Sequence, residues 1–178
     1  GGAARRARRG GGGARPGRGP GGAPARPPPP PPPPGGGAGW GGGAAGAPRA
    51  CFEAALKYAG ERTAFGKPIA GTQIQQQKLA HMALEVNRAT LLALHLGRLK
   101  DAGRLRPEQV SMGKLGNVNA ALDVARSARQ VLGANGISLE YPVIRHMNNL
   151  ESVVTYEGTA DVHALVIGGA LTGVQAFR

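Results

Sequence analysis

The chain has 178 residues and a formal net charge of +12, which its composition divides unevenly. Residues 1–50 contain only Gly, Ala, Arg and Pro apart from Trp40, and the seven arginines of residues 1–48 supply +7 of that charge. A lone Cys51 excludes an intramolecular disulfide framework. The lack of about 18 consecutive apolar residues argues against a membrane span, and the basic start has no apolar segment typical of a secretory signal.

Residues 1–47 are expected to form a disordered, low-complexity tail, because they offer almost no large apolar side chains to bury. Eight consecutive prolines, Pro27–Pro34, predict a polyproline II rod. Three interpretations stay open: an Arg/Gly arm that binds nucleic acid, a rod that docks into an aromatic groove, and a stretch that is not genuine protein. The last is favoured, since all four residue types have codons with only G or C in the first two positions.

The first helix is expected to begin at Pro48, because the first turn of a helix tolerates the missing N–H of proline. It should run to about Ala59, where Gly60 ends it. The stretch 61–71 contains two glycines and a proline and therefore predicts a loop.

A long helix is predicted over residues 73–102, with Thr72 as its N-cap and Gly103 at its end. Its apolar residues recur every three or four positions and so share one face. That face consists of Leu79, Met82, Val86, Ala89, Ala93 and Leu96.

Pro107 opens the next predicted helix, with Glu108 in its first turn, where a negative charge suits the helix dipole. Gly133 ends it. The expected buried stripe consists of Val110, Leu115, Val118, Leu122, Ala125 and Leu132.

Two further helices complete the predicted fold. A short one should span Tyr141 to about Asn149, and a last one should follow the N-cap Thr159 and reach about Ala176. Because apolar residues cover more than half of the last helix, it is expected to be buried on several sides. Residues 48–178 are thus predicted to form an all-α antiparallel bundle.

Three motifs stand in order along the predicted bundle. Residues 62–69 (RTAFGKPI) are followed by Gln73 on the next helix, residues 130–136 are QVLGANG, and residues 156–159 are YEGT. Together they resemble the motifs of the acyl-CoA dehydrogenase family, and the resemblance covers residues 51–178. Further segments are most similar to glutaryl-CoA dehydrogenases: Arg145-His146, Asn149-Leu150-Glu151, Asp161–Leu165 and Leu171–Phe177.

The resemblance implies the C-terminal helical domain of an oxidoreductase that uses FAD to oxidise the CH–CH bond of an acyl-CoA. For the glutaryl-CoA type it implies oxidative decarboxylation to crotonyl-CoA, in lysine and tryptophan degradation. Electrons would pass to an electron-transfer flavoprotein. A homotetramer is implied, in the bacterial cytoplasm or the mitochondrial matrix. The family's N-terminal helical and middle β domains are absent from residues 1–178, so the chain is expected to be inactive alone.

By the same resemblance, Glu157 is the catalytic base, and its carboxylate would need desolvation to remove an α-proton. Its backbone N–H would help to polarise the thioester carbonyl. Ala134 and Gly169 stand where the family commonly has Gly and Arg. The predicted substrate-binding residues are Tyr156 and Gly158, and the predicted FAD-binding residues are Arg62, Phe65, Gln73, Gln130, Gly133 and Thr159.

The four histidines show no metal-ligand spacing with Cys51, and neither Asp161 nor His163 is given a catalytic task. No metal site is therefore predicted. One function of a different class stays open: a helical-bundle interaction protein whose basic tail binds nucleic acid or a partner's groove.

Overall fold

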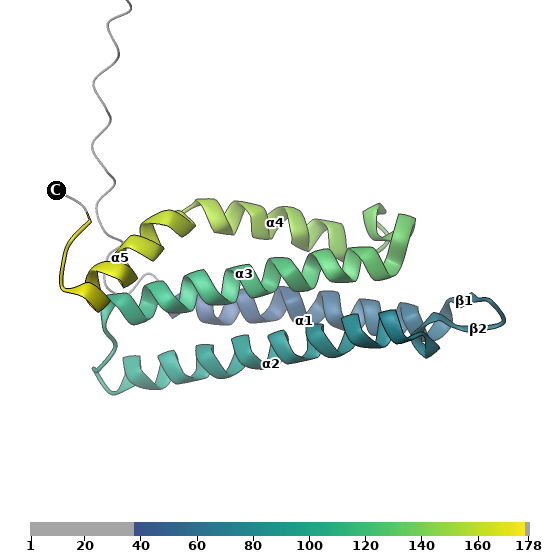
Figure 1. The fold of residues 1–178 in the computed structure, drawn as a ribbon, viewed down its shortest axis with the longest axis horizontal. Helices are drawn as coiled ribbons and strands as arrows, with labels where there is room; N and C mark the ends of the chain where they lie inside the picture. The colour runs from purple at the N-terminus through teal and green to yellow at the C-terminus, as the bar shows by residue number, and fades with distance from the viewer. Residues whose placement is uncertain (1–37, 177–178) are drawn as a thin grey trace, which may run out of the picture.

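A computed structural model describes residues 38–176 of the chain, and side chains from residue 46 onward. The interpretations of the tail at residues 1–37 fall outside the described residues, whereas residues 38–47, also predicted to be disordered, form the first part of a helix. The described part is an antiparallel helical bundle, which confirms the predicted fold class (Figure 1). Its helices are α1 (Ala38–Glu61), α2 (Gln73–Asp101), α3 (Pro107–Leu132), α4 (Val143–Thr155) and α5 (Ala160–Thr172), with 3-10 turns at Ile69–Gly71 and Gly133–Ile137.

Helix α3 is the centre of the bundle. It packs against all four of the other helices, α1, α2, α4 and α5 (Figure 1). The predicted apolar stripes on α2 and α3 face this centre. Burial of such side chains contributes about 1.5–3 kcal/mol each, so the stripes supply the main stabilisation. The buried apolar residues of the core cluster are Cys51, Ala55, Ala59, Leu79, Met82, Ala121, Leu122, Val124, Ala125, Ala128, Val131, Leu132, Val143 and Leu150.

Helices α2 and α3 approach closely through a glycine and a buried amide. An added Cβ at Gly113 would lie 2.2 Å from Leu96 Cδ1, so the absence of a side chain there lets the two helices meet. Four residues further along, Asn117 Nδ2 donates a hydrogen bond of 3.1 Å to the carbonyl of Ala89. This bond satisfies a polar group that would otherwise be buried without a partner.

The expected start of the first helix at Pro48 is wrong. Helix α1 begins at Ala38, and Pro48 lies inside it, fully buried. A proline within a helix removes the hydrogen bond of its own nitrogen, and its ring crowds the carbonyl four residues earlier, at a cost of about 3 kcal/mol. The helix nevertheless continues through the proline.

Three other features differ from the sequence prediction: the loop after α1, the end of α4 and the end of α5. The predicted loop after α1 contains a two-stranded hairpin, β1 (Thr63–Ala64) and β2 (Lys67–Pro68), which is too short to leave a pattern in the sequence. Helix α4 extends six residues past Asn149, to Thr155. Helix α5 ends at Thr172 instead of near Ala176, because Gly173 takes a left-handed conformation with φ 73°.

The apolar surface of the last helix, predicted to be buried in part by a missing domain or another subunit, is largely exposed within the described residues. Only His163 and Gly169 of α5 are buried, while Leu171 is 75% exposed. Within the same described part, no helix is long and apolar enough to cross a bilayer.

The turn after α3 provides a test of packing. An added Cβ at Gly136 would lie 2.5 Å from the Arg129 carbonyl oxygen and 2.9 Å from its Cα, both backbone atoms. Gly136→Ala should therefore lower the free energy of unfolding by about 1–3 kcal/mol in urea denaturation. The matched control is the exposed helical Gly116, where the nearest side-chain atom is 3.7 Å away and alanine should stabilise by about 0.5–1 kcal/mol. Equal effects at the two positions would contradict this account.

Candidate functional site

The predicted catalytic motif forms the tight turn between α4 and α5. Two consecutive residues of the turn have left-handed backbone, Glu157 with φ 54° and Gly158 with φ 100°. Glycine adopts this region freely, but for a glutamate it is unusual and must be held by its surroundings. Thr159 then caps α5, since its Oγ1 accepts a hydrogen bond of 3.4 Å from the amide of Val162. The predicted N-cap is confirmed.

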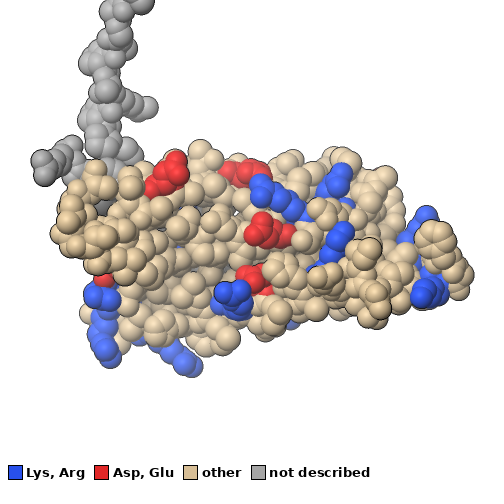
Figure 2. Space-filling view, viewed as in Figure 1, with Lys and Arg blue, Asp and Glu red and all other residues tan. Residues whose placement is uncertain are grey.

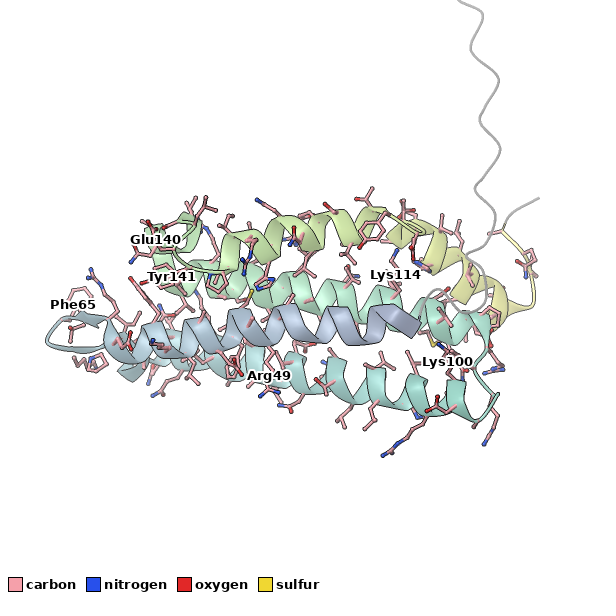
Figure 3. All side chains as sticks on the ribbon, turned by 180° about the vertical axis from the view of Figure 1, so that it is seen from behind. Arg49, Phe65, Lys100, Lys114, Glu140 and Tyr141 are labelled. Carbon is pink, nitrogen blue, oxygen red and sulfur yellow. The ribbon has the colours of Figure 1, made fainter. Side chains whose placement is uncertain are left out.

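A buried lysine on α3 forms hydrogen bonds to the backbone of this turn. Lys114 is 4% exposed. Its Nζ donates hydrogen bonds to the carbonyl of Tyr156 and, at 2.8 Å, to the carbonyl of Gly158. The same nitrogen lies 5.8 Å from the centre of the Tyr156 ring. Figure 3 shows Lys114 beneath the junction of α4 and α5.

The second support of the turn is a buried histidine. His163 of α5 is 2% exposed, and its Nδ1 lies 3.1 Å from Ser111 Oγ on α3. An added Cβ at Gly158 would lie 2.9 Å from His163 Nε2, so the ring packs directly against the glycine backbone. Nε2 makes no hydrogen bond to any described residue. The turn is thus fixed between an ammonium group and an imidazole ring.

The electrostatics of the two groups are linked. Burial lowers the pKa of Lys114, and the nearby Glu157 carboxylate opposes that change. Burial also lowers the pKa of His163, and the positive Lys114 lowers it further, whereas backbone groups of Glu157 and Gly158 raise it. His163 therefore favours its neutral form, which suits a ring that is enclosed beside a buried cation.

The carboxylate of Glu157 lies in the exposed part of the turn. The sequence predicted a desolvated base, and the described residues do not supply that desolvation. A small cavity of about 10 Å³ lies beside Lys114, Asn119 and His163 and has room for about one water molecule. The described residues hold the backbone of Glu157 in place and leave the residue exposed.

A second group of predicted residues lies at the opposite end of the bundle. Arg62 and Gly133 line a hollow of about 450 Å³ between the end of α1 and the turn after α3. Tyr58 and Asn135 line the same hollow, and Asn135 Nδ2 donates a hydrogen bond of 3.0 Å to Tyr58 Oη. Figure 2 shows positive side chains at this hairpin end of the molecule. Ala134, where a glycine was expected, is also part of the lining.

The other predicted cofactor residues of this end are exposed outside the hollow. Phe65 lies at the hairpin tip with φ 54° and is 99% exposed (Figure 3). Gln73 opens α2 and Gln130 lies in the last turn of α3, and both are exposed. This arrangement presents an aromatic ring, a guanidinium group and two amides around one end of the bundle.

The structure therefore divides the predicted site residues into two groups. Glu157, Tyr156, Gly158 and Thr159 share one turn, while the rest lie at the hairpin end. Lys114 and Gly133 are 19 residues apart on α3, which corresponds to roughly 28 Å at 1.5 Å per helical residue. The predicted cofactor residues do not form a single continuous surface.

Sequence reasoning missed the supports of the turn, namely Lys114, Ser111 and His163. One signal was present: Lys114 lies four residues after Val110 and four before Val118, both on the predicted apolar stripe of α3. A lysine in line with a buried stripe must find an internal partner, because an unpaired buried charge is costly. The partner itself, a turn more than forty residues away, leaves no local signal.

The sequence pattern described as Acyl-CoA dehydrogenase, C-terminal domain, matches residues 38–172. The chain belongs to the acyl-CoA dehydrogenase family through this domain, and the resemblance found in the sequence is confirmed.

Comparisons within the family place glutaryl-CoA dehydrogenases among the similar proteins. The Desulfococcus multivorans glutaryl-CoA dehydrogenase is 40% identical over 131 residues, 73% of this chain. Human mitochondrial short-chain specific acyl-CoA dehydrogenase is 36% identical over 133 residues, 75% of this chain. The chain spans about a third of the length of these relatives, 34% and 32%.

Two solved structures of glutaryl-CoA dehydrogenase from Mycobacterium smegmatis also match. One has a TM-score of 0.78 at 63% identity, and the other, in complex with FADH2, has a TM-score of 0.78 at 52% identity. Each match covers 80% of this chain and 37% of the solved chain.

The lowered pKa of His163 predicts a pH dependence of stability. The unfolded chain takes up a proton near pH 6.5, the ordinary value for histidine, whereas the folded chain does so only at lower pH. The contribution of His163 to the free energy of unfolding should therefore be at its maximum above about pH 6.5. Below that pH the free energy of unfolding should decrease. His146, whose pKa is lowered by burial and then by Arg145, acts in the same direction.

Thermal unfolding between pH 5 and 8 checks this prediction. His163→Gln should flatten the decline, while His81→Gln on the exposed face of α2 should leave it unchanged. A His163→Gln variant with the wild-type pH dependence would show that His163 does not carry the effect.

Proposed function

We propose that this chain supplies the base and part of the flavin-binding surface of an acyl-CoA dehydrogenase, in which Glu157 removes the α-proton of an acyl-CoA thioester. The observation that carries the proposal is the left-handed turn, in which Glu157 is exposed while Lys114 holds the carbonyls of Tyr156 and Gly158. A base must lie within hydrogen-bond reach of the proton that it removes, so a fixed backbone at this position favours the chemistry.

The neighbours of Glu157 have matching tasks in the proposed reaction. The backbone N–H of Glu157 helps to polarise the thioester carbonyl, which stabilises the charge that develops on its oxygen. Tyr156 and Gly158 contact the substrate, and the missing side chain of Gly158 lets a ligand approach the backbone. Substrate and partner domains that cover the exposed carboxylate would exclude water and raise its basicity.

The hollow at the hairpin end fits an anionic dinucleotide. The planar guanidinium of Arg62 can donate two parallel hydrogen bonds to a phosphate, and Gly133 offers backbone without a side chain. Bound FAD would supply the acceptor for the hydride that leaves the β-carbon. Phe65, Gln73 and Gln130 would hold the same dinucleotide around the rim, and Thr159 would contact flavin beside Glu157.

The separation of roughly 28 Å along α3 favours two different flavins over one. Each chain would place Glu157 and Thr159 against its own flavin and the hairpin end against the flavin of a neighbouring subunit. This geometry supports a homo-oligomer, and a homotetramer is the form that the family resemblance implies.

The substrate we propose is glutaryl-CoA, with oxidative decarboxylation to crotonyl-CoA and electron transfer to an electron-transfer flavoprotein. The 63% identity to a glutaryl-CoA dehydrogenase supports this choice over short-chain substrates, for which the human relative is 36% identical. A cytoplasmic or mitochondrial-matrix location would follow from this reaction. Because the chain spans a third of its relatives, we propose that it acts only together with N-terminal helical and middle β domains.

A hybrid enzyme tests the role of Glu157. Residues 38–178 would replace the matching domain of the Mycobacterium smegmatis glutaryl-CoA dehydrogenase, and FAD reduction by glutaryl-CoA would be followed. The hybrid should turn over, and Glu157→Gln should lower kcat by about 10²–10⁴-fold, the usual contribution of a general base. The control is Glu140→Gln, another exposed carboxylate, at the far end of the bundle.

The partner domains test the substrate subtype. A second hybrid with the domains of the human short-chain enzyme should assemble poorly, because fewer contacts match at 36% identity. The proposal is overturned by a FAD-loaded, active hybrid in which Glu157→Gln keeps wild-type kcat. The subtype alone is overturned if the short-chain hybrid is the more active one.

The flavin surface at the hairpin end gives a separate prediction. Arg62→Ala in the active hybrid should weaken FAD binding about tenfold to a hundredfold, because a hydrogen bond to a charged group contributes about 1.5–3 kcal/mol. At saturating FAD, kcat should stay unchanged. Arg104→Ala, in the exposed connection between α2 and α3, is the matched control. Identical FAD affinities for the two variants in isothermal titration would remove Arg62 from the site.

A further inference from the structure

We propose that Lys114 is a positioning residue, whose ammonium group fixes the left-handed backbone at Glu157 by holding the carbonyls on both sides of that residue. This inference deepens the proposed function and takes its meaning from the proposed role of Glu157 as base. It adds a residue on a different helix to the machinery of the turn.

The geometry of the two hydrogen bonds carries the proposal. The carbonyl of Tyr156 belongs to the peptide group just before the Cα of Glu157, so its orientation sets φ at Glu157. The carbonyl of Gly158 belongs to the peptide group just before Thr159, and Lys114 Nζ holds it at 2.8 Å. One nitrogen thus fixes the first and last peptide planes of the turn, and the values of 54° and 100° for φ lie between them.

The burial of Lys114 indicates that its charge has a structural role and that the side chain does not simply fill space. A lysine can usually extend its ammonium group to water, but this one is 4% exposed and directs its donors at two backbone carbonyls. Burying an ammonium group is costly unless its donors are satisfied. A methionine would fill the same space without that cost, so the charge is explained by the backbone that it holds.

Among the described residues, Lys114 is the side chain with hydrogen bonds to the carbonyls of both Tyr156 and Gly158. His163 packs against Gly158 from the other side, but its Nε2 makes no hydrogen bond to the described residues. The ring limits how far the turn can move inward, and backbone groups of Glu157 and Gly158 act on its pKa. Glu157 itself is exposed, and its carboxylate interacts electrostatically with Lys114.

The test uses nuclear magnetic resonance on the purified chain of residues 1–178. A left-handed residue has a short distance between its own amide proton and Hα, so Glu157 should give a strong intraresidue NOE. In the ¹⁵N-labelled wild-type chain, the Nζ of Lys114 should give an ammonium signal that exchanges slowly with water. Lys114→Met should lose the strong NOE at Glu157 while the signals of α1 and α2 stay in place.

The matched control is Lys100→Met, an exposed lysine at the end of α2, which should keep the NOE (Figure 3). Chemical rescue separates positioning from general stability. In a Cys51→Ala background, Lys114→Cys is alkylated with bromoethylamine in denaturant and refolded, which restores an ammonium group on a side chain of lysine length. The strong NOE should return only after alkylation.

Each outcome decides the proposal. It is overturned if Lys114→Met keeps the strong NOE, or if alkylation fails to restore it in a folded chain. If Lys114→Met does not fold, the wild-type ammonium signal decides, and rapid exchange of all lysine Nζ groups overturns the proposal. These readouts need neither flavin nor substrate, so an inactive hybrid with Glu157 intact would count against the proposed function and not against this inference.

Discussion

The burial of α3 on several sides is the constraint on which the rest of the structure depends. Four other helices pack on it, and its own polar residues must find partners inside the bundle. Asn117 meets the backbone of α2, and Lys114 meets the turn between α4 and α5. The buried polar side chains of α3 hydrogen-bond to the backbone of α2 and of the turn between α4 and α5. The packing of α3 in the core therefore determines the conformation of that exposed turn.

The two groups of predicted site residues lie at opposite ends of the helical bundle. At one end, buried groups of α3 and α5 support a turn whose carboxylate faces outward. At the other end, the hairpin and the turn after α3 surround an open hollow that contains Arg62. Neither end is a complete reaction site within the described residues. In the proposed assembly, each end would be completed by other domains or by another subunit.

Residue patterns predicted the long helices well because their boundaries are marked. Thr72, Gly103, Pro107 and Gly133 mark the ends of α2 and α3, and each of these boundaries was placed within about a residue. The start of α1 could not be predicted, because its first residues share the Gly and Ala composition of the tail. The support of the turn by Lys114 is a contact between distant segments, and such contacts depend on the packing of the whole bundle.

The fully exposed Phe65 has a consequence for how the hairpin end meets its surroundings. A phenyl ring in water orders solvent that is released when a partner surface covers it, which is worth about 1.5–3 kcal/mol. The strands that carry it pair over only two residues each, so the ring is held on a short and compliant arm. Docking at this end can therefore draw on the hydrophobic effect at a single side chain, independently of any charge on the arriving surface.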